Sequence, residues 1–271
     1  MAATVVKTPD YLRLLAMAAS DPGDVDFLTP MHEGRLDGFI ARACFSNLDT
    51  VVAKLDQIGP ENREELSSGA YSFSVGKLLV TAPDFEEYLG GVDAYRERIE
   101  SLMPGAEAQI KGLFSRVFPN HSVELAYSVD GRPYPMTSIR NVPAEHELPA
   151  HYEREQFFQP GYADLLPRLD KSTLYAWFVQ ISAAEEVPAM VLYDLPVTGE
   201  MPHFTVDQMR RMREKIERFR RFRLPLAQGD LFFFDAGRRY HRVAHVGARN
   251  RWTLGGFAAL SGSGEKLWVW T

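Results

Sequence analysis

The chain has 271 residues, of which 45% are hydrophobic and 24% are charged, and its formal net charge is −6. This is the composition of an ordinary globular protein with a sizeable core, so wholesale disorder is excluded. The acidic balance argues against a general nucleic-acid binder, because such a protein needs a basic surface.

The sequence contains a single cysteine, Cys44, so no intramolecular disulfide can form. A reducing cytoplasm is therefore the compartment that we expect. The first residues lack the basic start and long apolar run of a secretory signal, and no stretch of about 18 apolar residues predicts a membrane span. We expect Cys44 to be a buried thiol within an apolar helical stretch.

Residues 1–120 are predicted to be mainly helical. The stretch 37–58 places apolar residues at three- and four-residue steps, which is typical of a helix. Two more helices are predicted over 92–103 and 106–118, separated by Pro104-Gly105. We expect this part of the chain to form a helical layer that backs a β core.

From about residue 123 the pattern changes to short runs rich in β-branched and aromatic residues. Gly, Pro, Asp and Asn lie between these runs, which is typical of strands joined by turns. Many short strands in one stretch favour a sandwich, a barrel or a jelly roll. The predicted class is α+β, in a single domain that spans 1–271, because no linker separates the two parts.

One helix is predicted to interrupt the strands, over about residues 205–222. Thr205 and Gln208 have the spacing of a capping box, and apolar residues follow at helical intervals. Residues 205–223 carry eight basic and three acidic side chains, a local charge of +5. We interpret this helix either as a solvated face or as a basic lid or docking surface for an anionic substrate or an acidic carrier.

The segment "YHRVAHVGARNRWTLGGF" contains two histidines four residues apart, His241 and His245. This spacing fits one face of a helix or one face of a strand. The dense aromatic and β-branched residues favour a strand, a turn and a second strand. We predict a hairpin with residue 245 opposite 251, or a bulge with the same effect, so that Arg251 and Thr253 face the same side as His241.

A third segment offers the partners that a metal ion at His241 would need. In "LPAHYEREQF", His151 and Glu153 present both side chains to one face of an extended chain. Two histidine nitrogens and one carboxylate oxygen form the facial ligand set of non-haem Fe(II) oxygenases. Taken alone, His151 and Glu153 would more often be an exposed polar pair on a loop, so the prediction depends on their combination with His241.

Together these segments resemble the Fe(II)/2-oxoglutarate-dependent dioxygenases, over about residues 123–260. His151-Tyr-Glu153 matches their His-x-Asp/Glu motif, and His241 lies ninety residues later, where the distal histidine is expected. Arg251 and Thr253 match the Arg-x-Ser/Thr that holds the far carboxylate of 2-oxoglutarate. The resemblance implies a catalytic iron on these three ligands, with 2-oxoglutarate as co-substrate and O2 as oxidant.

The "RWTLGGF" ending and the "TSIRNV" strand resemble a bacterial subgroup with N-acyl amino-acid hydroxylases and carrier-independent halogenases of alkaloids and nucleotides. This implies a double-stranded β-helix (jelly roll) over 121–271, with a helical layer over 1–120 and the basic helix inserted at about 205–222. The halogenases carry Gly or Ala where this chain has Glu153, and the small residue leaves room for halide. Glu153 therefore favours hydroxylation of a small molecule, with desaturation, epimerisation and cyclisation left open.

Four further residues are candidates for substrate contacts. Arg140 is either a surface or ion-paired arginine, or a clamp for a substrate carboxylate or phosphate. Tyr127, Trp177 and Phe157 could line the pocket, although aromatics on core strands more often pack together. We expect His245 to contact a ligand side chain or 2-oxoglutarate, or to be a core histidine. The basic helix makes anionic small molecules the first substrates to test.

Two other functions stay open on the sequence alone. A cupin-like metal-binding isomerase would use the same scaffold, but it would have no need of Arg251 and Thr253. A non-enzymatic jelly-roll binding module would use its histidines only structurally. We expect no nucleic-acid or membrane partner, and the sequence does not indicate an oligomeric state.

Overall fold

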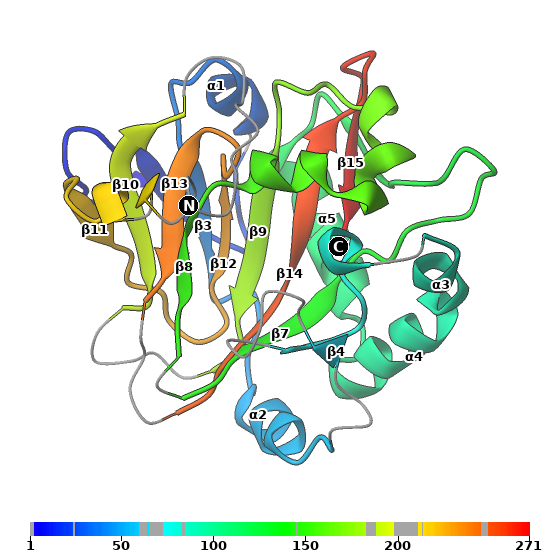
Figure 1. Ribbon diagram of the computed structural model, residues 1–271. Helices are drawn as coiled ribbons and strands as arrows, with labels where there is room; N and C mark the ends of the chain where they lie inside the picture. Colours follow the sequence, from blue (N-terminus) through cyan, green and yellow to red (C-terminus); the bar gives the residue numbers. More distant parts are fainter. Residues whose placement is uncertain are drawn as a thin grey trace.

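Two β-sheets face each other, and helices cover the outer face of the larger one (Figure 1). The computed structural model describes residues 3–23, 25–59, 64–65, 73–82, 85–144, 146–182, 188–197, 211–212, 214–244 and 249–271. Within these ranges, no helix is long and apolar enough to cross a membrane. The protein is thus rich in sheet with fewer helices, in agreement with the predicted α+β class.

The larger sheet has eleven strands in the order β1-β2-β3-β12-β9-β14-β7-β5-β4, with β15 pairing to β14 and β6 pairing to β15. Its strands are Thr4–Val5 (β1), Leu14–Ala18 (β2), Gly38–Arg42 (β3), Glu64–Glu65 (β4), Phe73–Val75 (β5), Ser122–Leu125 (β6), Ser138–Val142 (β7), Tyr175–Gln180 (β9), Leu231–Phe234 (β12), Arg251–Leu260 (β14) and Lys266–Trp270 (β15). β14 lies centrally, between β7 and β9.

The smaller sheet has four strands in the order β11-β10-β13-β8. They are Leu148–His151 (β8), Met190–Pro196 (β10), Arg221–Arg223 (β11) and Arg239–Val243 (β13). From β7 to β14 the chain changes sheet at every step except between β10 and β11. Segments far apart in the sequence therefore become neighbours in the smaller sheet, and β8 pairs with β13.

Five α-helices have both ends within the described residues: Leu28–His32 (α1), Asp49–Asp56 (α2), Phe85–Gly90 (α3), Val92–Leu102 (α4) and Ala106–Val117 (α5). Short 3-10 helices follow at Leu79–Thr81 (η2), Glu153–Phe158 (η3), Pro160–Ala163 (η4) and Leu166–Arg168 (η5). The helices predicted over 92–103 and 106–118 are confirmed as α4 and α5. The apolar stripe of α5 is buried, because Phe114 packs on Phe233 and Trp177 of the larger sheet.

The helix predicted over 37–58 is wrong in its first half, because Gly38–Arg42 is strand β3 between β2 and β12. Phe39 and Ile40 are both fully buried, although they point to opposite faces of the sheet. A strand buried on both faces has a continuous apolar run, which periodicity does not separate from a helix. Cys44 is buried as expected, but it lies after β3 rather than in a helix.

The two largest apolar cores of the described residues follow from the alternation of side chains along the strands. Phe233 points toward α5 and the other helices. Its neighbours Phe232 and Phe234 point into the space between the two sheets, where they stack on each other at 4.7 Å. The second core is the one that surrounds the site described below.

Two predictions near the C-terminal strands need correction. The predicted hairpin does not form, because β13 and β14 belong to different sheets and the chain crosses between them. The basic helix ends earlier than predicted: 211–212 and 214–216 are helical, but Arg221–Arg223 is strand β11. Residues 198–210, 213 and 245–248, which include His245, lie outside the described residues.

The turn before β12 gives a test of the fold. Gly229 has φ +84°, and a Cβ there would lie 2.0 Å from the carbonyl oxygen of Phe45. Gly131 has a similar φ of +87°, but no atom lies within 4 Å of its Cβ position. Gly131→Ala should cost about 1–3 kcal/mol of unfolding free energy from backbone strain alone. Gly229→Ala should lower the free energy of unfolding, measured in urea, clearly more than Gly131→Ala does, because it adds the clash with Phe45. Equal losses in the two variants would mean that the turn at Gly229 can move away from Phe45.

Candidate metal centre

His151, Glu153 and His241 converge between the two sheets. His151 ends β8 and lies directly opposite His241 of β13, while Glu153 is the first residue of η3. The Oε1 atom of Glu153 lies 3.7 Å from Nε2 of His151 and 3.5 Å from Nε2 of His241. One ligand atom from each residue lies within 4.8 Å of the other two, so the three could hold one metal ion.

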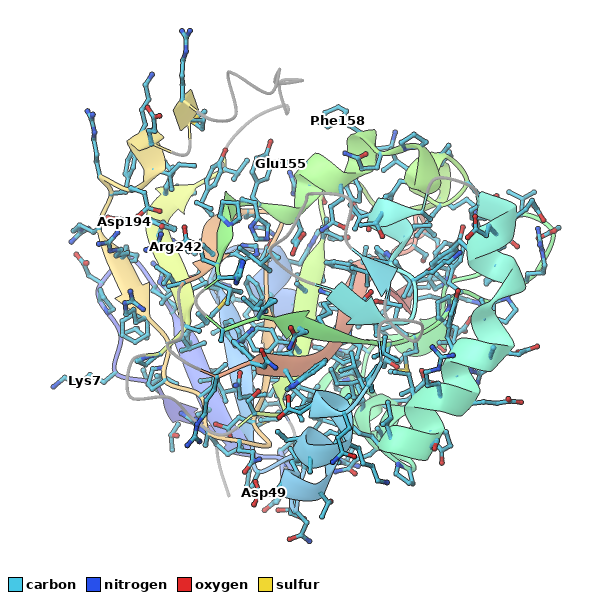
Figure 2. All side chains as sticks on the ribbon, turned by 60° about the horizontal axis from the view of Figure 1, so that its bottom comes forward. Lys7, Asp49, Glu155, Phe158, Asp194 and Arg242 are labelled. Atoms are coloured by element: carbon cyan, nitrogen blue, oxygen red, sulfur yellow. The ribbon has the colours of Figure 1, made fainter. Side chains whose placement is uncertain are left out.

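The three residues differ in exposure. Glu153 and His241 are buried, and the ring of Phe234 packs edge-on against His241 at 4.9 Å. The side chain of His151 is 25% exposed. Phe158, at the other end of η3, is exposed at the edge of the molecule (Figure 2). The site is therefore closed by the core on the His241 side and more accessible on the His151 side.

Backbone carbonyls orient both imidazole rings. Nδ1 of His151 donates to the carbonyl of Pro149 at 2.7 Å, and Nδ1 of His241 donates to that of Arg239 at 3.1 Å. A carbonyl oxygen only accepts hydrogen bonds, so the proton of each neutral ring lies on Nδ1. Each Nε2 lone pair is then directed toward Glu153, as metal-binding histidines require.

The electrostatics of the three groups favour a cation between them. Burial opposes the charge of Glu153, but the two imidazoles beside its carboxylate, which attract it when protonated, hold its pKa well below the usual range. Burial, together with the nearby His151, lowers the pKa of His241. Burial lowers the pKa of His151, but the carboxylate of Glu153 outweighs this effect and raises it, because a protonated imidazole would also carry an N–H on Nε2 for Glu153. A divalent metal ion would supply the positive charge that Glu153 attracts, and it would suit two imidazoles and a carboxylate.

An ion pair between the sheets supports His241. Arg239, the first residue of β13, donates from Nη2 and Nε to Oδ1 of Asp37 at 2.6 and 3.0 Å. Its Nη1 also donates to the carbonyl of Tyr193 on β10. Asp37 directly precedes β3, so this pair ties the larger sheet to the smaller one. It thereby fixes the Arg239 carbonyl that orients His241.

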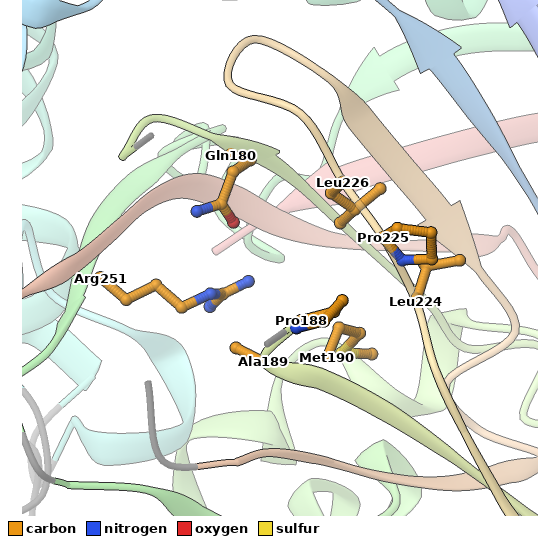
Figure 3. Close-up of a pocket in the computed structure, with 8 residues that line it drawn as sticks. All are labelled: Gln180, Pro188, Ala189, Met190, Leu224, Pro225, Leu226 and Arg251. Atoms are coloured by element: carbon orange, nitrogen blue, oxygen red, sulfur yellow. The ribbon is translucent and has the colours of Figure 1, made fainter. Parts of the chain in front are cut away.

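Arg251 and Thr253 face the space between the sheets from β14, and both are buried. The Arg251 guanidinium lies 5.1 Å from the centre of the Phe178 ring on β9. A pocket of about 90 Å³ lies beside it (Figure 3). Its lining is polar at Arg251 and Gln180 and otherwise apolar: Pro188, Ala189, Met190, Leu224, Pro225 and Leu226. The two residues thus reach the interior without the predicted hairpin.

Two of the candidate substrate residues lie on the same inner side. Arg140 of β7 pairs directly with Thr253, and its guanidinium lies 4.9 Å from the centre of the Phe257 ring. Phe157 is in η3, four residues after Glu153, and its ring packs on Tyr162. Both belong to elements that surround the three converging residues.

The other two aromatic candidates lie elsewhere, which corrects the expectation that they line the pocket. Trp177 alternates with Phe178 on β9, so it points to the opposite face of the sheet and packs on Phe114 of α5 at 5.4 Å. Tyr127 is 38% exposed and packs on Trp268 of β15. Reading β9 by its two-residue alternation would have identified Trp177 as facing away from Gln180.

Gln180 and Asp37 are site residues that the sequence analysis missed. Gln180 ends the otherwise apolar run of β9, and a buried polar residue at a strand end is a signal that could have identified it. Asp37 is separated from Arg239 by 202 positions. No local pattern in the sequence predicts that contact, because it depends on how the two sheets pack.

Comparison with known families gives one match that spans nearly the whole chain. A family model described as the carrier-protein-independent halogenase WelO5 matches residues 12–271. This match confirms the bacterial subgroup that the motifs resemble. No curated protein matches the chain significantly in sequence.

Solved structures share the fold. The crystal structure of an N-substituted L-amino acid dioxygenase from Burkholderia ambifaria AMMD superposes with a TM-score of 0.57 at 14% identity, over 89% of each chain. A second structure of that dioxygenase, in complex with alpha-KG, gives a TM-score of 0.53 at 14% identity over the same shares. At this level of identity the likeness concerns the fold alone.

The Asp37–Arg239 pair predicts a loss of metal affinity at a distance. Asp37→Asn removes the negative partner of Arg239, so the carbonyl that orients His241 is held less firmly. We expect the affinity for a divalent metal such as Co(II), measured by its visible absorption, to fall about 10- to 100-fold. Asp194→Asn, which breaks an exposed ion pair with Arg220, should leave it unchanged. Unchanged affinity in a folded Asp37→Asn variant would contradict this role.

Proposed function

We propose that this chain, which belongs to the enzyme family of the carrier-protein-independent halogenase WelO5, is a non-haem Fe(II)- and 2-oxoglutarate-dependent oxygenase. The observation that carries the proposal is the convergence of His151, Glu153 and His241, with both Nε2 atoms directed at the carboxylate. Iron bound there, together with 2-oxoglutarate, would supply the O2-dependent oxidation of a C–H bond.

Arg251 and Thr253 would bind the far carboxylate of 2-oxoglutarate. A guanidinium is always charged and presents two parallel N–H donors to a carboxylate, and the Thr253 hydroxyl adds a third. Packing on Phe178 restrains the Arg251 guanidinium before any ligand arrives. The apolar walls of the adjacent pocket keep water away from the charged groups, which strengthens their attraction.

Glu153 favours oxygen transfer over halogenation. A halide could bind the metal only if the position of the carboxylate ligand were vacant. Here that position has a buried, ionised carboxylate, which fills the space and repels a second anion. We therefore propose hydroxylation of a small molecule, although the family includes a halogenase. Desaturation, epimerisation and cyclisation would need the same ligands and differ in how the substrate is placed.

We also interpret β7–β14 as a double-stranded β-helix. The larger sheet contributes β7, β14, β9 and β12 as neighbours, and the smaller contributes β8, β13, β10 and β11. Because of this alternation, β8 and β13, the strands that carry His151 and His241, lie side by side. We regard residues 1–120 and 121–271 as parts of one domain, because β3 pairs directly with β12.

The other functions considered are less well supported. Membership of an enzyme family removes the reason to expect a non-enzymatic binding module. An isomerase that does not use 2-oxoglutarate would not need a buried arginine beside the pocket. Succinate formation from 2-oxoglutarate separates the oxygenase from such an isomerase.

The ligand set can be tested by turnover and binding together. Wild-type protein with Fe(II), O2 and 2-oxoglutarate should form succinate, and candidate substrates should accelerate it. The candidates are amino acids, N-acylated amino acids, nucleotides and carrier-tethered acyl groups. His241→Ala should abolish Fe(II) binding and succinate formation, because only two ligands remain. His32→Ala, at an exposed histidine, should preserve both. An active His241→Ala variant would mean that another residue is the ligand.

The preference for oxygen transfer can be tested with halide. With an accepted substrate and excess chloride or bromide, mass spectrometry should detect a product that gains one oxygen atom and no halogen. The reason is that Glu153 occupies the position that a halide needs. A halogenated product from the wild-type enzyme would contradict the proposed role of this carboxylate.

A further inference from the structure

We propose that Arg140 recognises a carboxylate group on the substrate, at a position separate from that of 2-oxoglutarate. This inference rests on the proposed function, because it assigns the substrate class of the same site. It concerns a cation that the proposed iron and 2-oxoglutarate chemistry does not use.

Arg140 faces the interior next to Arg251, but the two guanidinium groups pack on different rings. Arg140 pairs with Thr253 across β7 and β14, and Arg251 pairs with Val142. The two arginines are therefore diagonal neighbours on one face of the sheet, with roughly 7–8 Å between their backbones. The Arg251 guanidinium lies over Phe178 of β9, and that of Arg140 lies over Phe257 of β14. The two guanidinium groups are therefore held against separate rings.

The hydrogen bonds of Arg140 leave much of its donor capacity available. Its Nε donates to Oγ of Ser138 at 3.2 Å, and its Nη2 donates to Oγ1 of Thr271 at 3.3 Å. Both acceptors are neutral hydroxyls, and they also bond to each other at 2.6 Å. A guanidinium has five N–H donors. Among the described residues, Nη1 has no hydrogen-bond partner and no carboxylate forms an ion pair with Arg140.

Within the described part of the chain, no carboxylate other than Glu153 acts on the charge of Arg140. Burial lowers its pKa, and Glu153 and Tyr162 are the groups that oppose this effect. In the proposed enzyme, Glu153 would neutralise one of the two positive charges of Fe(II). The two negative charges of 2-oxoglutarate would then balance the second charge of Fe(II) and the charge of Arg251. The single positive charge of Arg140 is then left over. A partly buried cation without an ion-pair partner among the described residues is costly, so binding an anion here is favoured.

A carboxylate fits this position better than a phosphate. The guanidinium carbon lies over the Phe257 ring, so the N–H groups at the periphery of the guanidinium are what it offers to a ligand. Two parallel N–H groups on that periphery match a planar carboxylate. A carboxylate carries one negative charge, equal to the charge left over, whereas a phosphate carries close to two at neutral pH. The substrate class that we infer is a small molecule with a free carboxylate.

The test uses benzoate and its uncharged analogue benzamide as probes. Protein loaded with Fe(II) and 2-oxoglutarate under anaerobic conditions is titrated with each by calorimetry, so that the Arg251 position is already filled. Wild-type protein should bind benzoate at least tenfold more tightly than benzamide. Arg140→Gln should abolish that preference, and Arg140→Lys should keep part of it because the charge remains. Equal binding of the two probes by the wild type, or an unchanged preference in Arg140→Gln, would overturn the proposal.

Control variants separate this proposal from its alternatives. Arg132→Gln, at an exposed arginine that pairs with Glu86, should bind benzoate as the wild type does. Arg251→Gln should weaken 2-oxoglutarate binding at least tenfold, and Arg140→Gln should change it less than about twofold. Equal loss of 2-oxoglutarate in both variants would place Arg140 in the co-substrate site and overturn the proposal. Thermal unfolding checks that each variant is folded.

The failure of the proposed function would look different. In that case the wild type would bind neither Fe(II) nor 2-oxoglutarate. The benzoate and benzamide titrations are therefore repeated on metal-free protein, since the position of Arg140 depends on the chain alone. A preference for benzoate that Arg140→Gln removes would then support the anion site independently of the iron chemistry.

Discussion

The geometry of the site depends on the pairing of β8 with β13, which sets His151 directly opposite His241. Neighbouring strands hold such facing side chains close together, and here the two ring centres lie 4.4 Å apart. A one-residue slip of this register would turn one histidine to the outer face. Glu153 completes the set because its backbone amide donates a hydrogen bond to the carbonyl of Ala236. Ala236 lies in the connection from β12 to β13, so this bond holds the start of η3 against that connection.

The sequence indicated which side chains converge better than it indicated the architecture around them. Residue type and spacing indicated His151, Glu153, His241 and Arg251, because a ligand motif is local and a family resemblance joins distant motifs. The route of the chain was not predictable in the same way. Aromatic and β-branched residues around position 245 indicate strands on both sides of a turn, but they do not indicate whether the two strands pair. In the structure they enter different sheets.

The errors at β3 and at Trp177 share one physical cause, which is burial on two sides. Phe39 and Ile40 belong to a strand covered on both faces, so its sequence lacks the alternation that distinguishes strand from helix. Trp177 is also a core residue, but it faces the helices rather than the site. Hydrophobicity alone does not indicate which of two cores a side chain enters. Counting along β9 from Gln180, which faces the site, would have shown that Trp177 is three positions away and therefore on the opposite face.

The ion pair between Asp37 and Arg239 has a consequence for what counts as the catalytic unit. The ligands and Arg251 all come from residues 121–271, which could suggest that the earlier residues only cover the core. Yet Asp37 lies in that earlier part, and β3 beside it pairs along the whole of β12. A fragment that starts at residue 121 would expose one edge of β12 and would lack the anchor of β13. The N-terminal strands thus belong to the smallest portion of the chain in which the imidazole of His241 is held in place.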